Sequence, residues 1–133
     1  MKKRWIGTVI GIVVSLALVL TGTCPAARVS MISKDELKAS LGKPNMVILD
    51  VRPPSAWMFS MSQIQGAVRE SPSDVGLWQK KYSKDQLIVL YCYSDVTSSG
   101  VAQQLMSTGF QKIYVLKGGW QEWSAAKYPV EIK

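Results

Sequence analysis

The chain has 133 residues, which is enough for one compact domain and a short additional segment. Apolar residues make up 47% of it and charged residues 19%, as in an ordinary globular protein. It contains no His, which excludes His-based metal sites, Cys–His dyads and Ser–His–Asp triads, and we expect neither a metal ion nor a cofactor. The formal net charge is +7, but the basic residues cluster only at the start of the chain, so we expect no nucleic-acid-binding surface.

Residues 1–26 have the pattern of an export signal or membrane anchor. A basic start, residues 1–4, is followed by an apolar run, residues 5–20, which is short for a membrane-spanning helix. Cys24 then follows as in a lipobox with one extra residue. Three outcomes stay open: lipidation of Cys24, cleavage near Ala26, or retention as an uncleaved anchor. Each of them predicts an exported protein, periplasmic or associated with the cell envelope.

Short apolar runs alternate with helical stretches over residues 28–133, which predicts an α/β domain with a mostly parallel sheet. In chain order we expect a helix from Lys34 to about Gly42 behind a capping box at Ser33, a strand at residues 46–50, a helical turn after Pro53-Pro54, and a helix capped by Ser73 or Asp74 that runs to about Tyr82. We then expect a strand at residues 87–91, a helix ended by Gly109, a strand at residues 113–116, and a last helix between Gly118-Gly119 and Pro129.

Cys92 directly follows the strand expected at residues 87–91, and a short polar loop separates it from the next helix. In open α/β sheets, ligands bind beyond the carboxyl ends of the strands, next to helix N-termini. Free backbone N–H groups and the helix dipole stabilise a thiolate or a persulfide there. The sequence therefore predicts that Cys92 is an exposed nucleophile surrounded by inward-facing amides. The opposing interpretation is a structural cysteine, since free Cys is commonly buried.

Five short motifs occur in a recognisable order: Leu49-Asp-Val-Arg52, Ile64-Gln-Gly-Ala67, Val89-Leu-Tyr-Cys92 with its loop to Ser98, Gly109-Phe110, and Leu116-Lys-Gly-Gly-Trp120 with Trp123. By their order and spacing, the chain from about Ser30 to Lys127 resembles a single-domain rhodanese. The resemblance implies a three-layer α/β/α fold around a five-stranded, mostly parallel sheet. It also implies a sulfurtransferase or sulfur carrier in which Cys92 takes a sulfane sulfur from a small donor or a protein persulfide and passes it to a thiol acceptor. We expect the protein to act as a monomer.

The resemblance also implies which residues surround the transferred sulfur. The backbone N–H groups of the loop would cradle it, so the expected binding residues are Tyr93, Ser94, Asp95, Val96, Thr97 and Ser98. Asp50, Arg52 and Lys117 are expected as supporting residues, although Asp50 and Arg52 fit a purely structural role equally well. Ser98 is in addition a good helix cap.

Four departures from the family pattern affect the expected substrate. Rhodaneses of this type usually carry an Arg just before the final Ser of the loop, where this chain has Thr97, and often a Gly where it has Asp95. Gln63 replaces the usual His, and the acidic partner of Arg52 expected near Ala56 is missing. One charge pair about 6 Å apart at an effective dielectric of ~20 is worth roughly 3 kcal/mol before screening. We therefore expect weak activity on thiosulfate and a preference for a less anionic persulfide, unless Lys117 or Arg52 reaches the pocket.

Two other functions are alternatives to sulfur transfer. A catalytically weak or inactive rhodanese-like domain could serve as a binding or redox-sensing module in the cell envelope, and the missing charged residues favour this alternative. A phosphatase or arsenate reductase of the same superfamily needs a loop one residue longer that ends in Arg, and Ser98 argues against it.

Overall fold

The computed structural model describes residue 22 and residues 28–133. The export segment expected at residues 1–26 and Cys24 fall outside the described residues, except for Gly22. In chain order the elements are β1 (Ser30–Ile32), α1 (Lys34–Ser40), β2 (Met46–Asp50), α2 (Pro54–Phe59), β3 (Ser62–Ile64), β4 (Val68–Arg69), α3 (Val75–Trp78), the 3₁₀ turn η1 (Gln79–Lys81), β5 (Leu87–Tyr91), α4 (Val96–Ser107), β6 (Ile113–Leu116), α5 (Gly119–Ala125) and β7 (Val130–Ile132). None of the helices in this part of the chain has the length and apolar character needed to cross a membrane.

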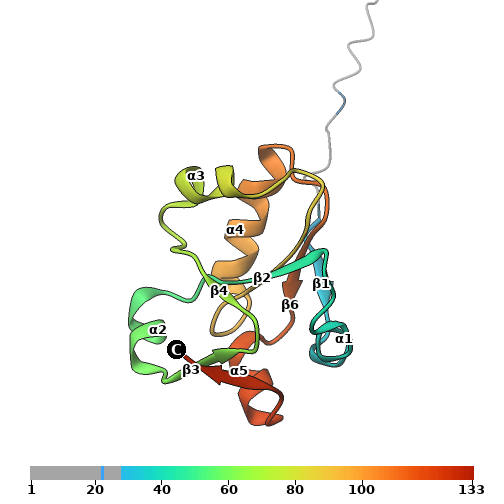
Figure 1. Cartoon of the computed structure of the whole chain (residues 1–133). Coiled ribbons are helices and arrows are strands. Elements are labelled where there is room, and N and C mark those ends of the chain that lie inside the picture. The colour runs from blue at the N-terminus through green and yellow to red at the C-terminus, as the bar shows by residue number, and fades with distance from the viewer. Residues whose placement is uncertain (1–21, 23–27) are drawn as a thin grey trace, which may run out of the picture.

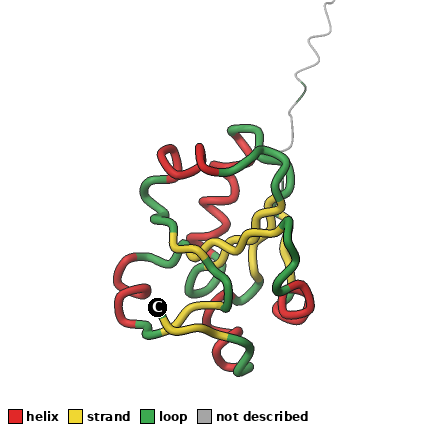
Figure 2. Tube along the Cα trace, viewed as in Figure 1, coloured by secondary structure: helices red, strands yellow, loops and turns green. Residues whose placement is uncertain are grey.

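Five strands form one sheet in the order β1-β6-β5-β2-β4, and every neighbouring pair is parallel. Figure 1 shows α3 and α4 on one side of β2 and α5 on the other, and Figure 2 shows the same layers by type of element. The expected three-layer fold around a five-stranded parallel sheet is confirmed. A second, two-stranded antiparallel sheet pairs β3 with β7, which the sequence did not predict.

The central strand β5 sends alternate side chains into two separate cores, as the period of a strand requires. Ile88 and Leu90 pack into a cluster with residues of α3 and α4, whereas Val89 and Tyr91 pack into a cluster with residues of α1 and α5. Cys92 continues the first series and lies in the cluster on the α4 side. The alternation thus places its sulfur between the sheet and α4.

Local signals in the sequence explain where α1 and α2 begin. Ser33 and Glu36 form the predicted reciprocal capping box of α1. Pro54 is the first residue of α2, where its missing N–H and fixed φ do no harm. The single helix expected up to Tyr82 is instead α3 followed by η1. The N-cap residue of α3, Asp74, makes no side-chain capping bond, and Gly76 lowers the helix propensity of the first turn of α3.

Candidate active site

Cys92 lies just past the carboxyl end of β5, and its sulfur faces the first turn of α4. The backbone N–H of Ser98 donates to Cys92 Sγ at 3.4 Å, and Ser98 Oγ lies 3.3 Å from the same sulfur, where either atom can donate. The Ser98 hydroxyl is also within hydrogen-bond distance, 3.2 Å, of the carbonyl oxygen of Asp95. One amide, one hydroxyl and the positive end of a helix therefore converge on the thiol, and all three stabilise negative charge on sulfur.

The expectation of an exposed sulfur is wrong, because Cys92 is only 2% exposed. The cause is the early start of α4: only Tyr93, Ser94 and Asp95 separate Cys92 from the helix, and the fully buried Ser98 covers the sulfur. Of the amides in the expected cradle, only that of Ser98 is a hydrogen-bond donor to Sγ. The sulfur thus has one backbone donor in place of a ring of them.

The loop after Cys92 is fixed from outside by the start of α5. The N–H of Trp120 donates to the carbonyl of Cys92 at 2.8 Å, and the N–H of Gln121 donates to the carbonyl of Tyr93 at 3.0 Å. These contacts need Gly119, because a Cβ on that residue would lie 1.9 Å from the carbonyl oxygen of Ser94. The Gly118-Gly119 pair therefore has a structural role, with both residues at positive φ.

Asp50 and Arg52 form a fully buried ion pair. Arg52 Nη2 lies 2.6 Å from Asp50 Oδ2 and also donates to the carbonyl of Ser62, and Arg52 Nε donates to both carboxylate oxygens at 3.0 Å. The Tyr91 hydroxyl donates to Asp50 Oδ2 at 2.8 Å, and burial, followed by the charge of Asp50, raises the pKa of Tyr91. Arg69 lies 3.7 Å from the same carboxylate. Sequence reasoning missed Tyr91 and Arg69 as partners of Asp50, although Tyr91 and Asp50 end adjacent strands and pair in register.

The model of the rhodanese-like domain family matches residues 33–126. The chain belongs to the rhodanese family. The matched region includes Cys92, the loop after it and the Asp50–Arg52 pair. It also includes the Gly118-Gly119 turn that fixes the loop.

Sequence relatives include sulfurtransferases. Thiosulfate sulfurtransferase GlpE of Glaesserella parasuis serovar 5 is 33% identical over 86 residues, which cover 65% of this chain and 78% of that protein. Thiosulfate sulfurtransferase GlpE of Actinobacillus succinogenes is 34% identical over 87 residues, which cover 65% of this chain and 77% of that protein. The rhodanese domain described here thus belongs to a family of sulfurtransferases.

Solved structures share the fold. The rhodanese-like domain of an Anabaena protein, solved by NMR, has a TM-score of 0.69 at 30% identity and covers 80% of this chain and 81% of its own. A rhodanese-related protein from Thermoplasma volcanium has a TM-score of 0.67 at 23% identity, covers 78% of this chain and 99% of its own, and shows similarity of fold alone.

The side chains expected to replace the missing loop Arg differ in their availability. Arg52 is fully buried and pairs with Asp50 through its Nε and Nη2 atoms, whereas Lys117 is exposed. Thr97 is half-buried in the first turn of α4, and Asp95 is the N-cap residue of α4 but makes no side-chain capping bond. Neither Arg52 nor Lys117 therefore offsets the negative charge that Asp95 adds at the start of the helix.

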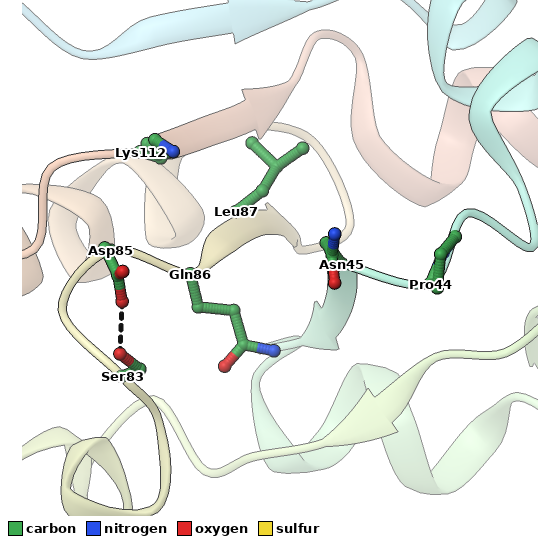
Figure 3. A pocket seen from close by; sticks show the side chains of 7 residues that line it. All are labelled: Pro44, Asn45, Ser83, Asp85, Gln86, Leu87 and Lys112. Carbon is green, nitrogen blue, oxygen red and sulfur yellow. Dashed lines mark hydrogen bonds between the residues drawn. The ribbon is translucent and has the colours of Figure 1, made fainter.

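Two hollows differ in their relation to Cys92. One, of about 390 Å³, adjoins the loop and is lined by Ala56, Phe59, Ser60, Tyr93 and Trp120. Another, of about 530 Å³, lies at the amino ends of β2 and β5, where Figure 3 shows Ser83 hydrogen-bonded to Asp85 and Lys112 at the start of β6. Active sites of parallel sheets lie at the opposite, carboxyl ends of the strands. The hollow beside Tyr93 is thus the one that adjoins the candidate site.

Proposed function

We propose that this rhodanese is a sulfurtransferase or sulfur carrier that moves a sulfane sulfur through a persulfide on Cys92. One observation carries the proposal: Cys92 Sγ lies at the N-terminus of α4 with the N–H and the hydroxyl of Ser98 within 3.4 Å. These groups stabilise the Cys92 thiolate that attacks the donor. Membership in a family that includes thiosulfate sulfurtransferases supports the same chemistry.

The transfer takes two displacement steps. In the first, the Cys92 thiolate attacks the outer sulfur of the donor, a new S–S bond forms, and the donor residue leaves with the electron pair of the broken bond. In the second, an acceptor thiolate attacks the outer sulfur of the persulfide, a new S–S bond forms there, and Cys92 leaves as a thiolate. Electrons balance without an external oxidant or reductant, so the reaction needs no cofactor.

A donor reaches Cys92 only when the loop after it moves, because the sulfur is covered. Tyr93 is the exposed residue of this loop and lines the adjoining hollow. We propose that a small persulfide or a protein persulfide approaches from this hollow. Opening breaks the hydrogen bonds that Trp120 and Gln121 donate to the loop, and this local opening costs less than global unfolding.

Replacing Thr97 by Arg restores a cation beside the sulfur and raises kcat/KM for thiosulfate by about tenfold, mainly through KM. Thr97 is half-buried, so solvent screens the charge and the gain falls below the roughly 3 kcal/mol of the unscreened pair. Steady-state kinetics with thiosulfate measure the effect, and Thr97→Gln, which adds length without charge, is the matched control. Equal rates for the Arg and Gln variants would contradict the charge argument.

Replacing Ser98 by Ala removes the hydroxyl but keeps the N–H at the sulfur. We expect kcat to fall by about tenfold, because a hydrogen bond to a charged sulfur contributes roughly 1.5–3 kcal/mol and the N–H retains part of it. Ser99→Ala is the control, since the Ser99 hydroxyl bonds only to the carbonyl of Asp95. A larger loss in the Ser99 variant would show that the effect arises from the loop backbone.

Mass spectrometry tests the proposed function. The purified protein is incubated with a sulfane donor, its thiols are blocked, and peptides are mapped. Gain of one sulfur atom on Cys92, removed again by an acceptor thiol, supports the transfer. An unmodified Cys92 under conditions that load a known sulfurtransferase favours the alternative, a rhodanese-like binding or redox-sensing module, which the burial of the thiol also favours.

We also propose that the domain works as a monomer outside the cytoplasm, either released by cleavage near Ala26 or linked to the membrane by its N-terminal segment or by a lipid on Cys24. The support is the basic and apolar pattern of residues 1–26. The intact mass of the protein from its native membrane distinguishes the three processing outcomes. A full-length, unlipidated species recovered from the cytoplasm would overturn this proposal.

A further inference from the structure

Two buried N–H donors in the segment from Arg52 to Trp57 lack a hydrogen-bond acceptor. Among the described residues, two buried side-chain polar atoms have no hydrogen-bond partner: Arg52 Nη1 and Trp57 Nε1. Both are N–H donors, and both belong to the segment that enters and forms α2. A buried donor without an acceptor costs free energy, more so on a charged group. The group that would satisfy these donors beside α2 is therefore a hydrogen-bond acceptor.

The charges around this place leave a positive surplus. The single carboxylate of Asp50 faces two guanidinium groups, those of Arg52 at 2.6 Å and Arg69 at 3.7 Å. Lys133 is near enough that, after desolvation, the charge of Arg52 lowers its pKa. Glu131 on β7 is engaged elsewhere, since it accepts from the side chain of Gln63. The acceptor best suited to this surplus is an anion.

A pocket lies beside Trp120, the residue against which the unpaired guanidinium packs. Ala56 of α2 lines the hollow of about 390 Å³ together with Trp120 and Tyr93. The guanidinium carbon of Arg52 lies 4.6 Å from the centre of the Trp120 ring, so Arg52 packs against the residue that forms one wall. Ala56 is also where the family resemblance leads us to expect an acidic partner for Arg52. The methyl side chain of Ala56 supplies no acceptor there.

Helix α2 is the wall best able to move. Each of its six residues is exposed or half-buried as a whole, although Trp57 Nε1 is covered, and its N-terminus has no side-chain capping bond. Phe59 at its end is 91% exposed. Since Arg52 Nη1 is covered in this structure, a ligand reaches it as α2 shifts outward. Weakly packed elements of this kind open at low free-energy cost.

We propose that the pocket between α2 and the Cys92 loop binds a carboxylate, which pairs with the unsatisfied guanidinium of Arg52. Because Tyr93 lines the same pocket, the carboxylate is that of the sulfur donor or acceptor, which rests on the proposed function. The site thus selects a thiol or persulfide that carries a carboxylate over an uncharged one.

A built-in carboxylate tests the site without any ligand. Ala56→Glu supplies the missing anion from α2, and we expect its melting temperature to rise by about 5 °C. Ala56→Gln has the same length without the charge, and Ser55→Glu places the same charge at an exposed neighbouring position that does not line the pocket. Neither control gains more than about a third of that rise. Equal melting temperatures for Ala56→Glu and Ser55→Glu overturn the proposal.

Acetate tests the site in the unmodified protein. At constant ionic strength, saturating acetate raises the melting temperature of the wild type by a few degrees, acetamide has no effect, and Ala56→Glu does not respond to acetate. No response of the wild type overturns the proposal even if the glutamate variant fails to fold.

Kinetics test the substrate class. With a loaded Cys92 persulfide, kcat/KM for 3-mercaptopropionate exceeds that for 2-mercaptoethanol by about tenfold after correction for the thiolate fraction of each. The preference disappears in Ala56→Glu. If acetate binds but Cys92 never forms a persulfide, the proposed function fails and the carboxylate site stands. If the persulfide forms and acetate has no effect, the site fails and the function stands.

Discussion

Replacement of Cys92 by Ser lowers sulfur transfer from any sulfane donor by at least about a thousandfold, the scale of loss seen when an essential nucleophile is removed. An oxygen nucleophile forms no persulfide, so the first displacement step is lost and not merely slowed. Rates with thiosulfate and with a small persulfide measure the effect. Cys24→Ser is the matched control, because it removes the other cysteine of the chain, and it keeps full activity.

Stability has to be separated from catalysis in this variant. Cys92 is part of a buried cluster with residues of the sheet and α4, and a buried hydroxyl in its place can lower the free energy of unfolding. Cys92→Ala removes the sulfur without adding a polar group, so both variants are compared by thermal unfolding. Transfer that survives in a folded Cys92→Ala protein would contradict the persulfide mechanism.

The central strands are the part of the fold that the sequence predicts best. Strands β2, β5 and β6 have the bounds expected from their apolar runs, because most of their residues are buried, Tyr114 of β6 being the exposed exception, and hydrophobicity alone marks them. Gly109 at positive φ follows the end of α4, as expected from the left-handed conformation that glycine permits. Continuous burial and backbone conformation are local properties, which explains why they can be predicted.

The peripheral strands could not be predicted in the same way. β1, β3, β4 and β7 have two or three residues each and are mostly exposed or half-buried, so their sequences carry no hydrophobic pattern. They exist because a partner strand is in place: β7 pairs with β3 across a separation of more than sixty residues, Ser62 opposite Ile132. Pairing at such distance depends on the assembled fold.

Of the candidate site, too, the local features could be predicted from the sequence and the packing could not. The place of Cys92 after β5 and before α4 was predicted from the chain, but the burial of its sulfur was not. That burial depends on how early α4 begins, and Asp95 starts the helix without a side-chain capping bond that the sequence could have announced. The unpaired donor of Arg52 likewise follows from the packing of α2 and Trp120, although the missing acid at Ala56 pointed to it.

Gly119→Ala should displace the Cys92 loop and reduce sulfur transfer by at least about a hundredfold, a loss typical of a catalytic group moved by about 1 Å. The added Cβ would lie 1.9 Å from the carbonyl oxygen of Ser94 and 2.6 Å from that of Cys92. Both are backbone atoms of the loop, so the loop itself must shift. Overpacking and the positive φ together lower the free energy of unfolding by about 3 kcal/mol.

Gly118→Ala separates this collision from the cost of the backbone conformation. Gly118 also has a positive φ, of 76°, but the three atoms nearest to its added Cβ all belong to the side chain of Glu122, which is flexible and can turn away. We expect a loss of about 1 kcal/mol in the free energy of unfolding and nearly unchanged transfer. Chemical denaturation and steady-state rates measured on both variants decide the matter. If the two alanine variants lose activity equally, the loop is not held in place by the close approach of Gly119, and the contact of Ser98 with Cys92 must be maintained from within α4 alone.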